Sequence, residues 1–195
     1  MVGRRKGPSL VELTALALLT QGPRHAWDLH RFIVDTHKDF VTGLPRSLYH
    51  AMNRLAGDGL VAPVETTREG NRPERTVYEI TEDGRAFLAT QLRQLLETPG
   101  RDTEPFVASL SLFGCLSETD VSRALRTRAA VLEGQTRSAE QTIAGLTETG
   151  LPRVLLLELD YERSRADAEL AWVRALIADI DAGQITWTGS LPEFP

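Results

Sequence analysis

The feature that most limits how this chain of 195 residues can fold is the stretch 43–61, GLPRSLYHAMNRLAGDGLV. Its apolar side chains recur at the three- and four-residue steps of an α-helix and gather on one side. They are Leu44, Leu48, Ala51, Met52 and Leu55. Pro45 is tolerated in the first turn, where an N–H is not needed, and Gly57 and Gly59 mark the end. The stretch therefore predicts a short helix that is buried on one side.

The other side of this helix carries the groups that recognise nucleic acid. It offers two guanidiniums, an imidazole, an amide and a hydroxyl, and no carboxylate comes before Asp58. The residues are Arg46, Ser47, His50, Asn53 and Arg54. Such groups hydrogen-bond to base edges and phosphates in a major groove, so we predict DNA contact here rather than a solvated face. Tyr49 should be partly buried, with its hydroxyl on a phosphate or its ring in the core.

Two further helices are predicted before this one. Ser9 and Glu12 have the spacing of a capping box at the start of the first, and Gly22 followed by Pro23 ends it. The second runs over about residues 26–37. Three short helices with tight turns, the last two close together, form a helix-turn-helix arrangement.

A β-hairpin should follow directly. Residues 60–66 read as extended, residues 67–74 as a polar tip, and residues 75–80 alternate as a strand does. A hairpin at this position is a wing, and its tip carries arginines, which favour minor grooves and phosphates. We therefore predict DNA contact for Arg72 and Arg75 rather than a plain exposed loop.

The remainder is predicted to be helical. Thr81 caps a helix that continues to about residue 97, and the Thr-Pro-Gly at 98–100 breaks the chain, so we place the domain boundary between residues 98 and 99. Beyond it, two long stretches carry apolar seams at alternating steps of three and four and are joined by a turn at 150–152. A hairpin of two such helices cannot bury all of its apolar side chains by itself. A second copy of the chain is the simplest partner that could bury the rest. The fold class is thus mainly α, a winged helix-turn-helix domain over 1–98 followed by a coiled-coil-like dimerisation domain over 99–195.

Charge and composition exclude several other classes of protein. Residues 1–90 hold 12 Lys and Arg against 11 Asp and Glu, while residues 91–195 hold 10 against 16, so the acidic half would leave the first half to approach DNA. One cysteine, Cys115, allows no disulfide within the chain, and it reads as a buried thiol rather than a redox sensor. No stretch is apolar for long enough to cross a bilayer, and an apparent signal peptide at the N-terminus is interrupted by Glu12. The four histidines lack metal-ligand spacing, and no cofactor or enzyme motif is present.

Three segments in order resemble the PadR family of winged helix-turn-helix transcriptional regulators: LLTQGPRHAWDL, LPRSLYHAMNRLAGDGLV and RTVYEITEDGRAFL. The match is specific over residues 10–90. It departs at Ala26 and Trp27, where the family usually has Gly-Tyr, at Met52 in a leucine position, and in the arginine cluster of the wing tip. The longer helical half is similar to the family branch with an extended C-terminal dimerisation domain.

The resemblance implies a homodimer that binds a palindromic operator in double-stranded DNA, usually as a repressor, and many members of the family are released by a small molecule or another signal. With its single cysteine, the protein is expected to be cytoplasmic. Phe113 and Trp172 are candidates to line an effector pocket, although packing alone also explains them. Two other classes remain open. One is a winged-helix adaptor that binds proteins without operator binding, and the other is a ligand-binding protein without DNA affinity.

Overall fold

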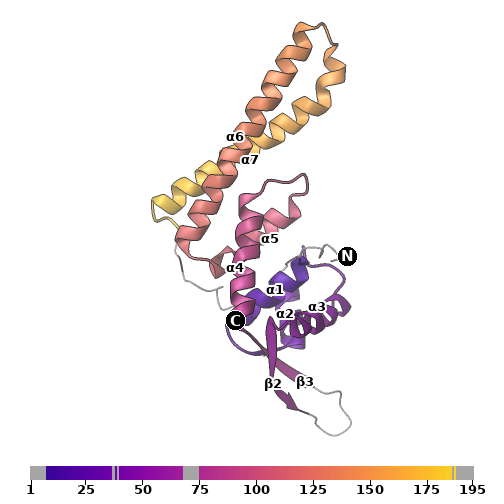
Figure 1. Cartoon of the computed structure of the whole chain (residues 1–195), viewed down its shortest axis with the longest axis vertical. Coiled ribbons are helices and arrows are strands. Elements are labelled where there is room, and N and C mark those ends of the chain that lie inside the picture. The colour runs from indigo at the N-terminus through magenta and orange to yellow at the C-terminus, as the bar shows by residue number, and fades with distance from the viewer. Residues whose placement is uncertain (1–7, 37, 39, 68–74, 186, 188–195) are drawn as a thin grey trace. The chain divides into compact units, whose positions relative to one another are not determined.

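The computed structural model describes residues 8–36, 38, 40–67, 75–185 and 187, and these divide into two compact units (Figure 1). The N-terminal unit contains the described residues up to Arg93 together with Asp102–Ser117. The helical unit contains Gln94–Arg101 and Glu118–Trp187. The predicted fold class is confirmed: the described chain is mainly helical, with a small antiparallel sheet in the winged part.

The N-terminal unit is built around α1 (Leu10–Leu19). Eight residues of this ten-residue helix are buried, so it must be covered on several sides. α3 (Arg46–Gly57), α5 (Glu104–Leu112) and the sheet all contact it, while α2 (Ala26–Asp35) packs against α3. The capping box predicted from Ser9 and Glu12 is present.

The sheet has three antiparallel strands in the order β1-β3-β2. β2 (Val61–Thr67) and β3 (Arg75–Ile80) form the predicted hairpin, with Val61 opposite Ile80 and an irregularity between Pro63 and Glu65. The short β1 (Arg24–His25) was not predicted. Two residues are too few for a sequence pattern, and β1 becomes a strand only because β3 lies beside it.

A close contact joins the hairpin to α4 (Glu82–Glu97). Thr81 donates its hydroxyl proton to the Gly59 carbonyl at 2.8 Å and accepts the Gly84 N–H at 3.0 Å. A Cβ on Gly84 would lie 2.1 Å from the carbonyl oxygen of Leu60. The glycine is therefore required for the approach of α4 to the backbone at the start of the wing.

The division into units differs from the boundary predicted between residues 98 and 99. α5 belongs to the N-terminal unit because Phe106, Ala108 and Leu112 are buried and the helix contacts α1. Lys38 reinforces this arrangement by donating from Nζ to the Ser111 hydroxyl at 2.6 Å. The Thr-Pro-Gly at 98–100 does follow the end of α4, but the chain returns to the N-terminal unit before it enters the helical one.

The helical unit is a hairpin of α6 (Glu118–Glu148) and α7 (Leu157–Asp181), with the short 3-10 turn η2 (Arg153–Leu156) before α7 (Figure 1). The predicted seams meet between the two helices: Leu125, Leu132 and Thr136 on α6 are buried, as are Leu170, Val173, Ile177 and Ile180 on α7. Gly150, with φ of 82°, makes the turn between them. Several apolar side chains around the turn remain exposed: Val154, Leu155, Leu157 and Tyr161.

We expect Gly84→Ala to destabilise the fold by about 1–3 kcal/mol, because the new methyl would overlap a backbone carbonyl that cannot rotate away. Gly57→Ala is the matched control, since a methyl group added there would meet nothing within 4 Å and α3 is already helical at that residue. Urea unfolding of both variants measures the difference. Equal stability of the two would contradict the close contact at Leu60.

The cysteine in the 3-10 turn η1 (Phe113–Cys115) provides a second prediction. Burial raises the pKa of Cys115 to about 11, although the Thr20 hydroxyl, 4.0 Å from its sulfur, acts in the opposite direction. At pH 8 the thiolate should be about 100-fold scarcer than for a thiol with the ordinary pKa of 9.0. Alkylation by iodoacetamide should accordingly be about 100-fold slower in the folded protein than in guanidinium chloride, as followed by mass spectrometry. Equal rates would show that the thiol is accessible and ionised.

Candidate nucleic-acid interface

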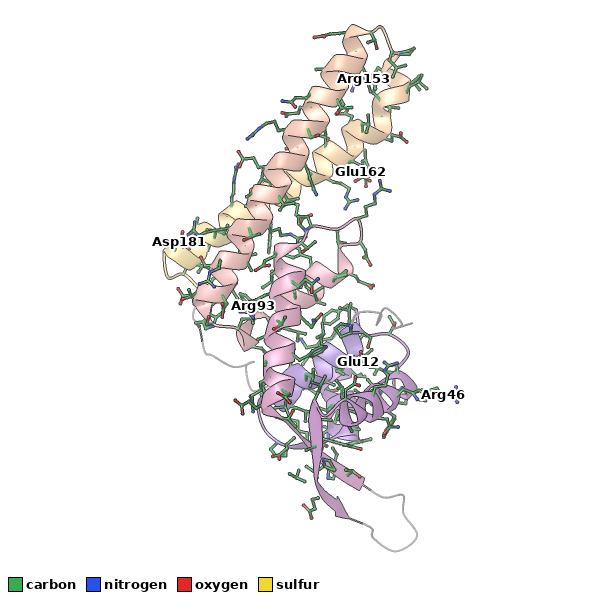
Figure 2. The ribbon with its side chains drawn as sticks, in the orientation of Figure 1. Glu12, Arg46, Arg93, Arg153, Glu162 and Asp181 are labelled. Carbon is green, nitrogen blue, oxygen red and sulfur yellow. The ribbon has the colours of Figure 1, made fainter. Side chains whose placement is uncertain are left out.

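The outward side of α3 is built by the same helical geometry that buries its other side. Leu48, Ala51, Met52 and Leu55 are at most 2% exposed. At about 100° per residue, Arg46, His50 and Asn53 fall on a common stripe opposite them, and all three are exposed. Figure 2 shows Arg46 extending outward from the start of α3. We call Arg46, His50 and Asn53 the outer stripe.

Tyr49 and Ser47 lie on the two flanks of this stripe. Tyr49 is 50% exposed, so about half of its surface is covered and half is open to solvent. Ser47 donates its hydroxyl proton to the Thr42 carbonyl at 2.9 Å. Its N–H also donates to the carbonyl of Gly43, whose φ of 74° turns the chain into the helix. Ser47 therefore holds the turn before α3 as well as bordering the stripe.

Arg54 lies on the same flank as Ser47 and is held by α1. Its Nε is 2.7 Å from Oε1 of Glu12, and the two side chains are 60% and 12% exposed. Sequence spacing did not reveal this contact, because the two residues are 42 positions apart. The guanidinium is thus partly neutralised before any ligand arrives.

The structure describes only part of the wing, where DNA contacts are predicted for Arg72 and Arg75. Arg72 lies outside the described residues. Arg75 begins β3, and the structure describes its backbone but not its side chain. Both therefore stay predictions.

The two aromatic residues predicted to line an effector pocket are not brought together within either unit. Phe113 is in η1 of the N-terminal unit, and Trp172 is half exposed on α7 of the helical unit. Neither lines the cavity that the structure shows, so their role also stays a prediction.

That cavity lies within the helical unit and has a volume of about 340 Å³. The segment 99–101 borders it on one side, and α6 and α7 form the other walls. Its apolar wall consists of Leu132, Ala139, Leu159 and Ala166, and its charged groups are Arg101, Arg163, Arg165, Glu162 and Glu169. The volume lies within the range of small-molecule sites, and half of the residues that line it are charged or polar.

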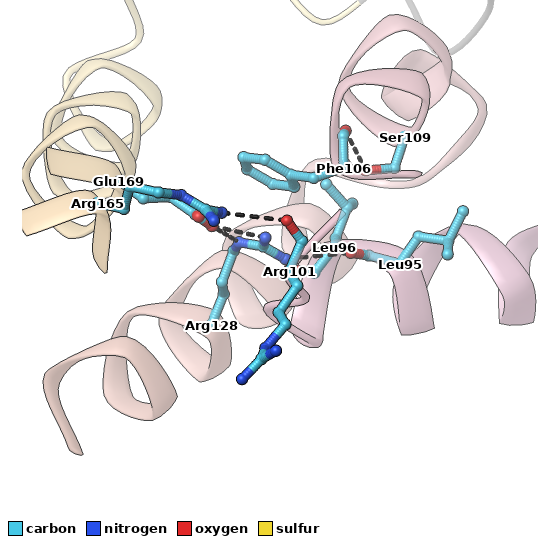
Figure 3. A network of polar contacts seen from close by, with 8 residues as sticks. All are labelled: Leu95, Leu96, Arg101, Phe106, Ser109, Arg128, Arg165 and Glu169. Atoms are coloured by element: carbon cyan, nitrogen blue, oxygen red, sulfur yellow. Dashed lines mark hydrogen bonds and ion pairs between the residues drawn. The ribbon is translucent and has the colours of Figure 1, made fainter. Parts of the chain in front are cut away.

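A buried arginine beside the cavity joins three helices (Figure 3). Arg128 on α6 is 2% exposed and donates from Nε to Glu169 on α7 at 2.6 Å. Its Nη1 donates to the carbonyls of Leu95 and Leu96 at the end of α4, both at 3.2 Å. Burial lowers the pKa of Arg128, and the hydrogen bond and charge of Glu169 oppose that shift. Arg165 similarly donates to the Arg101 carbonyl at 3.2 Å.

Sequence reasoning missed Arg128. The predicted seam passes through Leu125, Ala129 and Leu132, so position 128 lies beside it rather than on it. An arginine is normally solvated at such a position, so the apolar members of the seam alone do not reveal it. The carbonyls that stabilise it lie at a helix end, where cations are favoured.

Metal-binding and membrane-spanning features are absent from the described part of the chain. No group of three or more His, Cys, Asp or Glu residues there could hold a metal ion. Among the helices described, none has the length and apolar character needed to span a bilayer.

The part of the chain that contains α3 and the wing matches a known protein family. Residues 15–90 match the model of the transcriptional regulator PadR-like family. The negative transcriptional regulator PadR of Bacillus subtilis is 22% identical over 181 residues, covering 88% of this chain and 98% of that protein.

Solved structures of the Bacillus subtilis protein are also similar. Its complex with operator DNA shares 17% identity, covers 88% of this chain and 99% of its own, and superposes with a TM-score of 0.42. Its complex with p-coumaric acid shares 16% identity over the same fractions, with a TM-score of 0.38. The match over residues 15–90, and the likeness to a curated negative regulator across most of both chains, make this chain similar to the PadR-like transcriptional regulators.

Proposed function

We propose that this protein is a cytoplasmic repressor that binds a palindromic operator as a homodimer and is released by a small-molecule effector. The observation that carries the DNA-binding part is the outer stripe of α3. Three side chains able to hydrogen-bond to bases and phosphates are exposed together, on a helix whose opposite side is completely packed. No carboxylate belongs to α3 itself.

Each member of the stripe suits a particular contact. Arg46 can hold guanine or a phosphate with two N–H groups, and Asn53 can pair with an adenine edge. His50 lies between them and can donate or accept a hydrogen bond. Tyr49 on the flank reaches a phosphate, and Arg72 and Arg75 in the wing extend the contact to the adjacent groove.

Dimerisation is supported by apolar surface on the helical unit. Val154, Leu155, Leu157 and Tyr161 cluster in sequence around η2 and the start of α7, and each is more than half exposed. Adjacent exposed apolar side chains are typical of surfaces that another protein covers. In a dimer with twofold symmetry, two α3 helices would enter successive major grooves about 34–36 Å apart.

The effector is proposed to occupy the cavity of the helical unit. Two of its lining residues, Glu169 and Arg165, hold Arg128 and the Arg101 carbonyl respectively. A molecule that contacts Glu169 would compete for the partner of Arg128, whose Nη1 holds the last turn of α4. Binding in the cavity is thereby coupled to α4, which also contributes residues to the N-terminal unit.

We expect the double variant Arg46→Ala, Asn53→Ala to lose at least about 30-fold in operator affinity, since each good base contact contributes about 1–3 kcal/mol. Arg137→Ala is the matched control, because it removes an exposed helical arginine from α6 and should leave the affinity within about twofold. Operators would first be selected from random DNA, and affinities then measured by fluorescence anisotropy at several salt concentrations. Affinity that is unchanged in the double variant contradicts the assignment, and selection of no DNA by the wild type would favour the adaptor function.

We expect Ala166→Phe to block the effector response by filling the cavity, while Ala171→Phe on the exposed side of the same helix leaves it intact. Small aromatic and aliphatic acids, p-coumaric acid first, would be screened for release of the wild-type protein from its operator. Any compound that releases the wild type should lose its effect on Ala166→Phe alone. Release of both variants at equal concentration would place the effector elsewhere.

A further inference from the structure

Glu12 is an unusual residue in its surroundings. It lies in the first turn of α1, whose other described side chains are almost all apolar and buried, and it is itself only 12% exposed. A carboxylate removed from water to this extent needs compensating hydrogen bonds. The capping box of α1 uses only one of the two carboxylate oxygens of Glu12.

The two oxygens have separate partners. Oε2 accepts the Ser9 N–H at 2.7 Å and the Ser9 hydroxyl at 3.1 Å, which completes the capping box. Oε1 accepts from Nε of Arg54 at 2.7 Å. Glu12, labelled in Figure 2, thus connects the start of α1 to the last turn of α3 through one side chain.

The direction of Arg54 distinguishes it from the outer stripe. At about 100° per residue, Arg54 lies roughly 70° around α3 from the midpoint of Arg46, His50 and Asn53. Its side chain meets α1 at that flank instead of extending outward with the stripe.

We infer that Glu12 and Arg54 are positioning residues for DNA recognition: their ion pair fixes the rotation of α3 about its own axis, and Arg54 does not itself read the DNA. This inference rests on the proposed function. It also replaces the direct DNA contact that spacing predicts for Arg54.

The physical need for such a contact follows from how α3 is held. Apolar packing along one side resists separation of α3 from α1 strongly, but it resists small rotations weakly because it is not directional. At a side-chain radius of about 5–6 Å, a rotation of about 10° displaces the outer stripe by on the order of 1 Å. Recognition geometry must hold to about half that distance, so a contact at the flank of α3 controls specificity.

The stability of the protein should depend little on this pair, because the arginine is largely exposed and such pairs contribute little. Its effect on specificity can therefore be measured in folded variants. Glu12→Gln is the most informative change, because glutamine can still accept the Ser9 N–H in a capping box but loses the charge that holds Arg54.

The experiment compares operator and non-operator DNA for the wild type, Glu12→Gln, Arg54→Ala and the double variant. We expect each single variant to lose about tenfold in operator affinity, with non-operator affinity unchanged within about twofold. The double variant should be no worse than either single variant, because both break the same contact. Arg54→Lys should restore part of the affinity, since an ammonium can still pair with Glu12.

The sign of the Glu12→Gln effect separates positioning from simple electrostatics. Removing a negative charge should strengthen binding to all DNA if charge alone matters, whereas loss of positioning weakens operator binding only. Glu65→Gln, which removes the same charge from the exposed β2 of the same unit, is the control and should not lower operator affinity. Thermal unfolding of every variant checks that the fold is retained.

Three results would overturn the inference while leaving the proposed function intact. One is stronger binding of Glu12→Gln to operator and non-operator DNA alike. The second is a salt slope that falls by about one in Arg54→Ala, which would indicate a direct phosphate contact. The third is additive losses in the double variant. Absence of any DNA binding by the wild type would instead reject the proposed function, and this inference with it.

Discussion

The burial of α1 is the constraint on which the N-terminal unit depends. A helix with eight of ten residues buried cannot lie on a surface, so its neighbours must surround it. α3 and α5 do so from well-separated positions in the sequence. Once α3 is placed on α1 by its apolar side, the identity of its exposed residues follows from helical geometry. The polar stripe is therefore a consequence of core packing.

Charged side chains with little exposure restrict how the packed helices are oriented, because their hydrogen bonds are directional. Glu12 in the N-terminal unit and Arg128 in the helical unit each combine one ion pair with hydrogen bonds at the end of a helix. Neither arrangement is efficient for stability alone, because desolvation offsets much of the attraction. Both connect specific atoms of two helices. Apolar contacts also hold helices together, but they do not select particular pairs of atoms. This is the property that a protein needs when it must present side chains to a ligand in a fixed geometry.

The cavity of the helical unit lies beside the ion pair of Glu169 with Arg128. Glu169 lines the cavity and is also the partner of Arg128, which holds the end of α4. α4 contributes residues to both units, and its last turn is the part that Arg128 holds. Within the helical unit, the wall of the cavity is thus connected to the last turn of α4 through Glu169 and Arg128, by hydrogen bonds that are individually identifiable.

Local patterns were sufficient for most of the elements. The capping box at Ser9, the one-sided apolar pattern of α3, the alternation of β3 and the seams of α6 and α7 each depend on residues a few positions apart, where helix and strand periods act directly. The same reasoning made Arg46, His50 and Asn53 an exposed stripe. It could not show that Arg54 is held by Glu12, that α5 returns to α1, that β1 pairs with β3, or that Arg128 is buried. Those features join residues tens of positions apart, and only packing of the folded chain determines which distant groups come within hydrogen-bonding distance.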